Sequence, residues 1–487
     1  VRQRENLPLV GGQLTERLAL YPDYALYTDR WLNECLRTVV LRSIDGEGFA
    51  RIDDWSPGDT TAPRADLNRI DADTPNLGAD SPVPQILAKA GKGESLTESE
   101  IVRLLAVRGE ELTAVCSAAN DLRKMMNGDT VTYVVNRNIN YTNICYFKCQ
   151  FCAFSKGKMS ENLRGRPYDL GLDEIVRRAR EGWDRGATEV CMQGGIHPDY
   201  TGETYLEICR AVKAALPGMH VHAFSPLEVW QGAATSGLDL RTFLFELKEA
   251  GLGTLPGTAA EILDDEVRAV LCPDKISAGE WFEVMETAHD LGFKTTSTIM
   301  HGHIERPEHV ARHLLRIREL QARTGGFTEF VPLPFVHMEA PIYLKGKARK
   351  GPTFREAILI HAVARLALHP HITNIQASWV KMGPDGVKAC LNAGVNDLGG
   401  TLMNETITRS AGATHGQEMP PEAMEKLILS AGRRPLQRST PYGTPSQQQI
   451  AASFGAAPLT EVLNTPPTKN RGGDDSDLAQ TELVIGE

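Results

Sequence analysis

Residues 172–195 read LDEIVRRAREGWDRGATEVCMQGG and contain one helix followed by one strand. The helix is indicated by apolar side chains that recur every three or four residues. These are Leu172, Ile175, Val176, Ala179 and Trp183. The short apolar run at 188–193 then predicts a buried strand, which ends in a pair of glycines. The stretch therefore predicts one helix–strand unit of an α/β protein.

The same unit recurs on both sides of this stretch. Strands are predicted at 131–136, 188–193, 220–225, 252–255, 295–300, 327–332, 372–377 and 397–403. Amphipathic helices separate them. Eight strand–helix units over roughly 270 residues match a (β/α)8 TIM-type barrel better than a doubly wound sheet, which usually has fewer strands. In such a barrel we expect the chemistry at the carboxyl ends of the strands.

The composition is that of an ordinary globular protein. The 487 residues include 52 Lys and Arg against 62 Asp and Glu, a formal net charge of −10. This acidic balance argues against a protein whose main task is binding nucleic acid or an anionic membrane. No apolar run approaches the roughly 20 residues of a membrane span. Nine cysteines are too few for a disulfide scaffold, and no signal peptide is recognisable, so we predict a cytoplasmic protein.

Changes in composition divide the chain into four predicted parts. Residues 1–57 contain apolar and aromatic side chains, but too few for a core of their own. Residues 58–84, rich in Asp, Pro, Gly, Ala and Thr, are predicted to be a linker. The barrel domain is predicted at 85–435, with a helical extension at its start over about 85–127. Residues 436–487 are rich in Gln, Ser, Pro, Thr and Gly and are expected to be disordered.

Three of the nine cysteines lie within eight residues, directly after the first predicted strand. Residues 143–154 read NICYFKCQFCAF, so Cys145, Cys149 and Cys152 have the spacing Cys-x3-Cys-x2-Cys. Thiolates are the usual ligands of iron–sulfur clusters. Three of them on one loop leave one iron of a four-iron cluster without a protein ligand. An amine and a carboxylate can chelate that open iron.

Two other interpretations of these cysteines are a zinc knuckle and buried free thiols. A structural zinc site uses four ligands, usually in two separated pairs. Only the fold could bring Cys191 or His197 to such a site. A two-cluster ferredoxin would show Cys-x2-Cys-x2-Cys-x3-Cys-Pro, which the sequence lacks. The motif therefore favours one cluster held by three cysteines.

The spacing, with an aromatic residue before the third cysteine, resembles the motif of the radical S-adenosylmethionine (SAM) superfamily. The resemblance implies that the three cysteines hold a 4Fe-4S cluster and that SAM chelates its fourth iron. One electron from the reduced cluster then cleaves SAM to methionine and a 5′-deoxyadenosyl radical. The resemblance also implies four SAM-binding residues. They are Phe151 at the adenine, Gly194 and Gly195 at the amino group, and Glu261 near the ribose.

Four further stretches resemble the FO synthase group, whose product, a deazariboflavin, is the chromophore of the deazaflavin coenzyme. They are 138–143 (NINYTN), 193–198 (QGGIHP), 222–226 (HAFSP) and 403–406 (MNET). Two radical SAM modules make FO in this group. The first-acting module joins L-tyrosine to 5-amino-6-(D-ribitylamino)uracil, and the other closes the ring. This chain resembles the first-acting, 4-hydroxyphenyl transferase module over roughly residues 80–435.

The resemblance implies an electron donor such as flavodoxin or ferredoxin, and a cyclising radical SAM module as partner. In the fused actinobacterial enzymes the cyclising module comes first. Residues 1–57 resemble the tail of that module, so we expect them to be dispensable for coupling. Two alternatives stay open. One is a menaquinone-pathway radical SAM enzyme on the same scaffold, and the other is a non-enzymatic iron–sulfur electron-transfer protein.

Polar side chains at the predicted strand ends are the candidates for proton transfer. His197, after the glycine pair, and His222, in the third strand, are predicted to be catalytic. A loop-capping role for the first and a core role for the second are the alternatives. Other polar side chains at strand ends could contact a ligand. They are Ser225, Glu228, His301, His303, Asn404 and Glu405.

Overall fold

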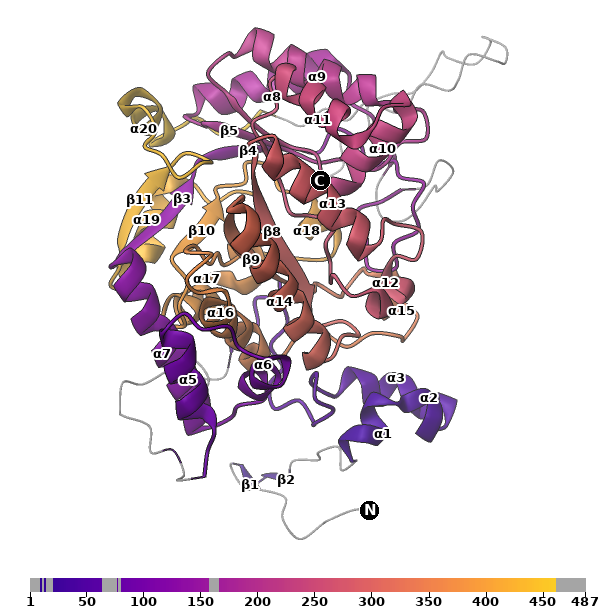
Figure 1. Ribbon diagram of the computed structural model, residues 1–487, viewed down its shortest axis with the longest axis vertical. Helices are drawn as coiled ribbons and strands as arrows, with labels where there is room; N and C mark the ends of the chain where they lie inside the picture. The colour runs from indigo at the N-terminus through magenta and orange to yellow at the C-terminus, as the bar shows by residue number, and fades with distance from the viewer. Residues whose placement is uncertain are drawn as a thin grey trace.

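The computed structural model describes residues 9–10, 13–14, 21–63, 77, 80–156 and 166–460. A parallel sheet with helices packed around it forms the centre of the molecule (Figure 1). Six strands pair in the order β4 (Asn136–Ile139), β5 (Glu189–Met192), β6 (His220–Ala223), β7 (Thr254–Leu255), β8 (Lys294–His301) and β9 (Phe327–Pro334). A second sheet has the order β10 (Asp397–Gly400), β3 (Thr130–Val134) and β11 (Arg434–Arg438).

Isolated parallel bridges connect the two sheets. They pair Phe330 with Ile375, Gln376 with Asp397, and Arg137 with Met403. The predicted α/β barrel is confirmed, but residues 372–377 contribute only the first two of these bridges and not a full strand. One reason is that the Ile375 amide donates to the side chain of Asn396, at 3.0 Å, and not to a neighbouring backbone.

Helices cover the outside of the sheet, as the alternating pattern predicts (Figure 1). They are α8 (Leu172–Asp184), α9 (Gly202–Ala215), α10 (Pro226–Ser236), α11 (Leu240–Glu249), α12 (Asp265–Leu271), α13 (Ala278–Asp290), α14 (Pro307–Thr324), α16 (Phe354–Leu368) and α17 (Trp379–Leu391). In α8 the predicted stripe is buried at Ile175 and Ala179, whereas Leu172 at the first helical position stays 39% exposed. The period of the pattern therefore located the helix and its inner face.

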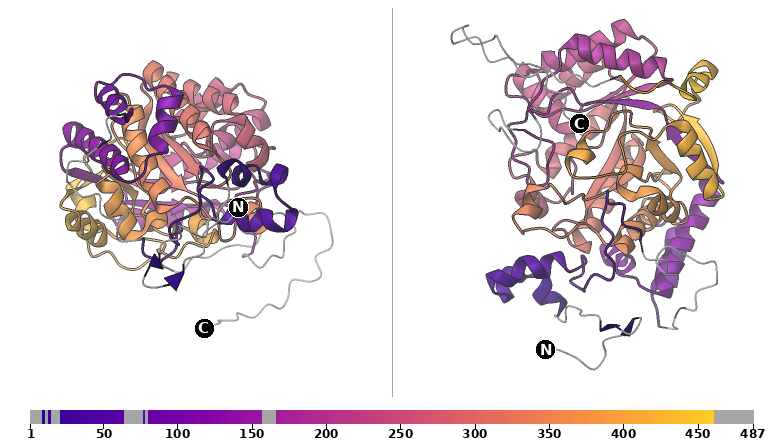
Figure 2. Two further views of the ribbon diagram at one scale, coloured as in Figure 1. Left: turned by 90° about the horizontal axis from the view of Figure 1, so that it is seen from below. Right: turned by 180° about the vertical axis from the view of Figure 1, so that it is seen from behind.

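The helical extension before the barrel is also present. It consists of α5 (Val83–Gly91), α6 (Glu98–Leu105) and α7 (Glu110–Asn127). A capping box between Thr97 and Glu100 starts α6, as the Ser/Thr-x-x-Glu pattern requires. Before it come the short strands β1 (Leu9–Val10) and β2 (Gln13–Leu14) and the helices α1 (Pro22–Leu26), α2 (Thr28–Trp31) and α3 (Glu34–Arg42). Figure 1 and the right view of Figure 2 place α1 to α3 at the other end of the molecule from α8 and α9.

Residues 43–59, here called the docking segment, pack against the barrel. Trp55 is 2% exposed and meets the ring of Phe354 edge-on, with 5.2 Å between ring centroids. The Asp53 carboxylate accepts a hydrogen bond from the Phe354 amide at 3.1 Å. These contacts oppose the expectation that everything up to residue 57 is dispensable, because they bury a large aromatic side chain. The predicted linker is described only at its start and end, and the domain boundaries stay predictions.

The fold continues past the predicted end of the barrel domain. It includes α15 (Pro341–Leu344), α18 (Ile407–Ser410), α19 (Pro421–Ser430) and α20 (Gln447–Ser453). The prediction of disorder from residue 436 is wrong up to residue 460, and residues 461–487 lie outside the described residues. The reason is a set of buried charges: Arg438 donates to Asp397 at 2.6 Å, and Thr440 donates to Glu189 at 2.6 Å. None of the described helices is long and apolar enough to cross a membrane.

Candidate active site

The three cysteines of the motif lie on the loop after β4, and all three line one cavity of about 270 Å³. The Cys152 amide donates to the Cys149 carbonyl at 3.3 Å, which closes a tight turn between them. The Gln150 amide donates to the carbonyl of Leu271 at 2.7 Å and anchors that turn on α12. The three are partly exposed, whereas four of the scattered cysteines are buried. These are Cys116, Cys209, Cys272 and Cys390.

The spacing of the sulfur atoms argues for a cluster over a single zinc ion. Tetrahedral zinc ligands at 2.3 Å place two thiolate sulfurs only about 3.8 Å apart. In the described part of the chain, one group of three His, Cys, Asp or Glu has its ligand atoms within 4.8 Å of one another, and it contains no cysteine. The three sulfurs are thus spread more widely than one zinc requires. A donor set of three thiols around one cavity fits an iron–sulfur cluster.

The environment of these thiols is partly apolar. Burial raises the pKa of the Cys149 thiol, and the nearby Lys275 ammonium opposes that effect. Burial also raises the pKa of Cys152, whose sulfur accepts a hydrogen bond from the Ser155 amide at 3.4 Å. A metal-bound cysteine is a thiolate, so binding releases the proton and replaces it by a metal–sulfur bond.

An ion pair lies beside the cysteines in the same cavity. The Lys275 ammonium is 2.8 Å from a Glu261 carboxylate oxygen and 5.5 Å from the centre of the Phe151 ring. Burial acts to lower the pKa of Lys275, but the Glu261 carboxylate and the Cys149 thiol outweigh burial and raise it. Phe151 and Glu261, both predicted to bind SAM, therefore meet through a lysine that sequence reasoning missed. Its position on the loop after α12 carried no motif.

Gly194 and Gly195 follow β5 and line the cavity, and their binding of the SAM amino group stays a prediction. A Cβ atom on Gly194 would lie 2.3 Å from the Tyr141 ring, and one on Gly195 would lie 2.2 Å from the Ile144 carbonyl oxygen. No larger residue fits at either position without a shift of its neighbours. The Gly195 amide donates to the carbonyl of Thr142 at 2.9 Å, so the pair brings β5 against the cysteine loop.

Glu228 joins several elements behind the glycine pair. Its carboxylate accepts hydrogen bonds from the Ser225 amide at 2.6 Å, the Gly194 amide at 3.1 Å and the Tyr141 hydroxyl. Burial raises the pKa of Glu228, while these hydrogen bonds act against burial. Ser225 and Glu228 form the capping box of α10 and also line the cavity. Their main visible task is to position Gly194.

Five further residues that line the cavity come from segments after the sixth strand of the sheet and are here called the far wall. They are Phe335, Val336, Lys381, Thr408 and Ala411. The Lys381 ammonium donates to the Thr408 hydroxyl at 2.8 Å. The docking segment supports this wall from outside, because the Gly58 amide donates to the Lys381 carbonyl at 2.7 Å. The carbonyl of Gly58 in turn accepts from the Thr414 amide at 2.9 Å.

The two histidines predicted to be catalytic do not line this cavity. His197 stacks on Tyr200, with 4.9 Å between ring centroids, and its Nδ1 accepts from the Asp199 amide at 3.1 Å. His222 lies within β6, and its Nδ1 is 2.7 Å from the Thr254 hydroxyl. Burial lowers the pKa of His222. These contacts match the capping and core roles, and the catalytic roles stay predictions.

Other polar residues noted at strand ends serve the scaffold. His303 pairs with Glu305 at 3.0 Å, and His301 lines a separate, smaller cavity. Glu405 accepts from the Thr408 amide at 2.6 Å and thereby starts α18. Asn404 is buried with a positive φ of 64°.

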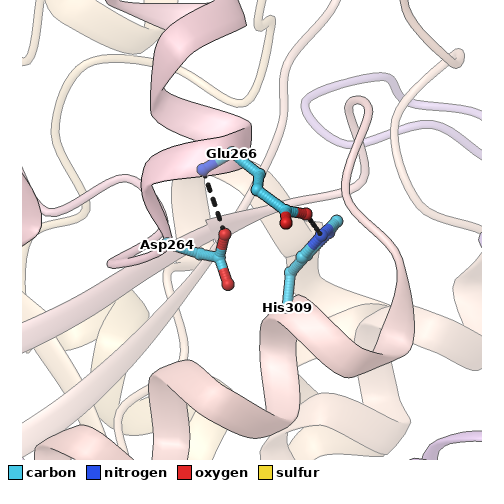
Figure 3. A group of neighbouring side chains, drawn as sticks. All are labelled: Asp264, Glu266 and His309. Carbon is cyan, nitrogen blue, oxygen red and sulfur yellow. Dashed lines mark hydrogen bonds and ion pairs between the residues drawn. The ribbon is translucent and has the colours of Figure 1, made fainter.

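The group of potential metal ligands without cysteine is Asp264, Glu266 and His309 (Figure 3). Asp264 caps α12 through the Glu266 amide at 3.2 Å. Its other oxygen accepts from Arg312 at 2.6 Å. These contacts satisfy the buried carboxylate without a metal ion.

Comparisons with known proteins identify families whose models match the segments that form this site. The model of the radical SAM superfamily matches residues 139–317, and the model of the CofH/MqnC C-terminal region matches residues 324–450. The 5-amino-6-(D-ribitylamino)uracil–L-tyrosine 4-hydroxyphenyl transferase of Methanothermobacter thermautotrophicus is 47% identical over 74% of this chain and 96% of its own length. The chain belongs to the family of this radical SAM transferase.

FO synthases, which are longer proteins, are similar over more of this chain. FO synthase of Streptomyces coelicolor is 45% identical over 93% of this chain, and FO synthase of Mycobacterium leprae is 47% identical over 83%. The chain spans about half the length of these two relatives, 56% and 47% respectively. Among solved structures, methylornithine synthase aligns with a TM-score of 0.57 at 20% identity, over 76% of this chain and all of that one. The latter likeness concerns the fold alone.

Proposed function

We propose that this chain transfers the 4-hydroxybenzyl group of L-tyrosine to 5-amino-6-(D-ribitylamino)uracil, on the route to FO. One observation carries the proposal: this chain matches the Methanothermobacter transferase over 96% of that protein's length. In this chain, moreover, the three cysteines of the motif line one cavity. Relatives that are 43–50% identical to this chain are named FO synthase, which favours this reaction over the menaquinone-pathway alternative.

Cys145, Cys149 and Cys152 would hold the 4Fe-4S cluster, with SAM on its open iron. When bound, this pair supplies a 5′-deoxyadenosyl radical that takes a hydrogen atom from L-tyrosine. Phe151, Gly194, Gly195 and Glu261 lie around the cysteines and would bind SAM. Lys275 holds the Glu261 carboxylate in one orientation at 2.8 Å.

The other groups of the cavity would orient the substrates. Phe335, Val336 and Ala411 on the far wall are apolar and suit an aromatic ring, while Lys381 and Thr408 supply polar contacts. Placing the reacting carbon against the radical supplies much of the rate acceleration in such a reaction. A flavodoxin or ferredoxin as electron donor, a cyclising module as partner and a cytoplasmic location belong to the same proposal.

The test is an anaerobic reaction of the reconstituted protein with reductant, SAM, L-tyrosine and the diaminouracil, analysed by mass spectrometry. We expect the coupled adduct and 5′-deoxyadenosine, without the fluorescent, cyclised deazaflavin. Adding a cyclising module should then yield FO. Cleavage of SAM without any adduct would contradict the proposed substrates, and no SAM cleavage at all would favour an electron-transfer protein.

A further inference from the structure

Two lysines line the cavity, and their electrostatic surroundings differ. Lys275 is neutralised by Glu261 at 2.8 Å. Lys381 has no carboxylate within 4.0 Å among the residues that the structure describes. Its ammonium makes one hydrogen bond there, to the Thr408 hydroxyl. An ammonium has three donors, so Lys381 keeps donors for a ligand.

Both the backbone and the hydroxyl partner of Lys381 are held in place. Its carbonyl accepts from the Gly58 amide at 2.7 Å, and the Thr408 amide donates to the Glu405 carboxylate at 2.6 Å. Burial lowers the pKa of Lys381, and the charge of Glu405 opposes that effect. A half-buried cation without a close counter-ion is costly, and an anionic ligand group would remove that cost.

The proposed reactants differ in charge, and this difference indicates which of them Lys381 would bind. The uracil and its ribityl chain are neutral, and the SAM carboxylate is expected on the cluster iron. L-Tyrosine has the remaining carboxylate. We propose that Lys381 binds the carboxylate of the amino-acid substrate and thereby selects an α-amino acid over the corresponding amine. This inference rests on the proposed function.

The test compares L-tyrosine with tyramine, which lacks only the carboxylate. Binding is measured by calorimetry on the anaerobic holoenzyme with SAM and without reductant, so that no turnover occurs. We expect Lys381→Met to weaken L-tyrosine binding about 10- to 100-fold, as loss of a charged hydrogen bond does. Tyramine binding should change less than about twofold, and Lys381→Arg should retain most of the affinity for L-tyrosine.

The matched control is Lys388→Met, which removes a lysine that lies in α17 beyond its break at Gly383 and does not line the cavity. Iron content and circular dichroism verify that each variant is folded and loaded. Equal L-tyrosine affinity of Lys381→Met and the wild type would overturn the proposal, as would an equal loss for tyramine. L-Tyrosine bound through Lys381 without adduct in the reductant-containing assay would contradict the proposed function but support this subsite.

Discussion

The cysteine loop and the far wall enclose the same cavity but are assembled in opposite ways. The cysteine loop takes its three thiols from eight consecutive residues, 145–152. The far wall combines residues that follow β9, begin α17 and form α18. Gly58, more than 300 positions before Lys381, supports this wall by a hydrogen bond to the Lys381 carbonyl. A site built from one loop shows itself as a motif in the sequence. A site built from distant segments becomes visible only in the fold.

The largest expected effect concerns the cysteine loop. Cys149→Ala should abolish cluster binding and SAM cleavage, because two thiolates do not hold a four-iron cluster with an open iron. Iron analysis and the yield of 5′-deoxyadenosine measure both. Cys209→Ala is the control, since Cys209 is buried in α9, and it should leave about four irons per chain. Full activity of Cys149→Ala would refute the cluster assignment.

The next effect concerns the docking segment that supports the far wall. Trp55→Ala should lower the free energy of unfolding by about 3 to 5 kcal/mol, because it empties a buried site against Phe354. Trp31→Ala should change it by less than about 0.5 kcal/mol, because Trp31 is 49% exposed. Denaturant unfolding of both variants gives the comparison. An effect of Trp55→Ala as small as that of Trp31→Ala would mean that the docking segment does not stabilise the barrel, in line with the expectation that residues 1–57 belong to another module.

The segment that follows Phe335 and Val336 should be sensitive to acid through His337, which packs on Tyr343. Burial, helped by Lys350, Arg51 and Arg42, lowers the pKa of His337 to about 4. The unfolded chain, with a pKa near 6.5, takes up this proton first as the pH falls. The stabilisation by neutral His337 is therefore complete above pH 6.5 and is lost as the pH falls from 6.5 to 4. At pH 5 the free energy of unfolding has fallen by about 2 kcal/mol.

His337→Phe keeps an aromatic ring but removes the titration. Unfolding free energies measured from pH 7 to pH 5 should fall less steeply for this variant than for the wild type. Parallel pH profiles would mean that His337 is not the responsible group.

The smallest effect is expected where the cysteine loop contacts α15 and the residue that follows it. The Ile342 amide donates to the Gln150 carbonyl at 2.7 Å, and the exposed Lys345 ammonium donates to the Gln150 side chain at 2.7 Å. Lys345→Met removes only the exposed bond, so its cost should stay below about 1 kcal/mol, with SAM cleavage unchanged. A larger loss of stability or of cleavage would mean that this side chain, and not the backbone, holds the cysteine loop.

The extent of sequence prediction follows the same division. The periodic stripes located the helices, and the spacing of Cys145, Cys149 and Cys152 located one side of the cavity. Lys275 and Lys381 were not assigned roles, because a lysine becomes informative only when its partners are known. The folded structure of residues 436–460 was missed for a similar reason. The segment is polar in composition, but Arg438 is buried because it pairs with Asp397.

The central claim is that the cysteine loop activates SAM while the far wall selects the amino acid. It is tested most directly by measuring 5′-deoxyadenosine and adduct in one anaerobic assay of the wild type, Cys149→Ala and Lys381→Met. The account predicts both products for the wild type and neither for Cys149→Ala. For Lys381→Met we expect at least about tenfold less of both products at subsaturating L-tyrosine, because the hydrogen atom of 5′-deoxyadenosine comes from L-tyrosine, and recovery of both at saturating L-tyrosine. Undiminished products at subsaturating L-tyrosine, or no recovery at saturating L-tyrosine, would contradict the claim.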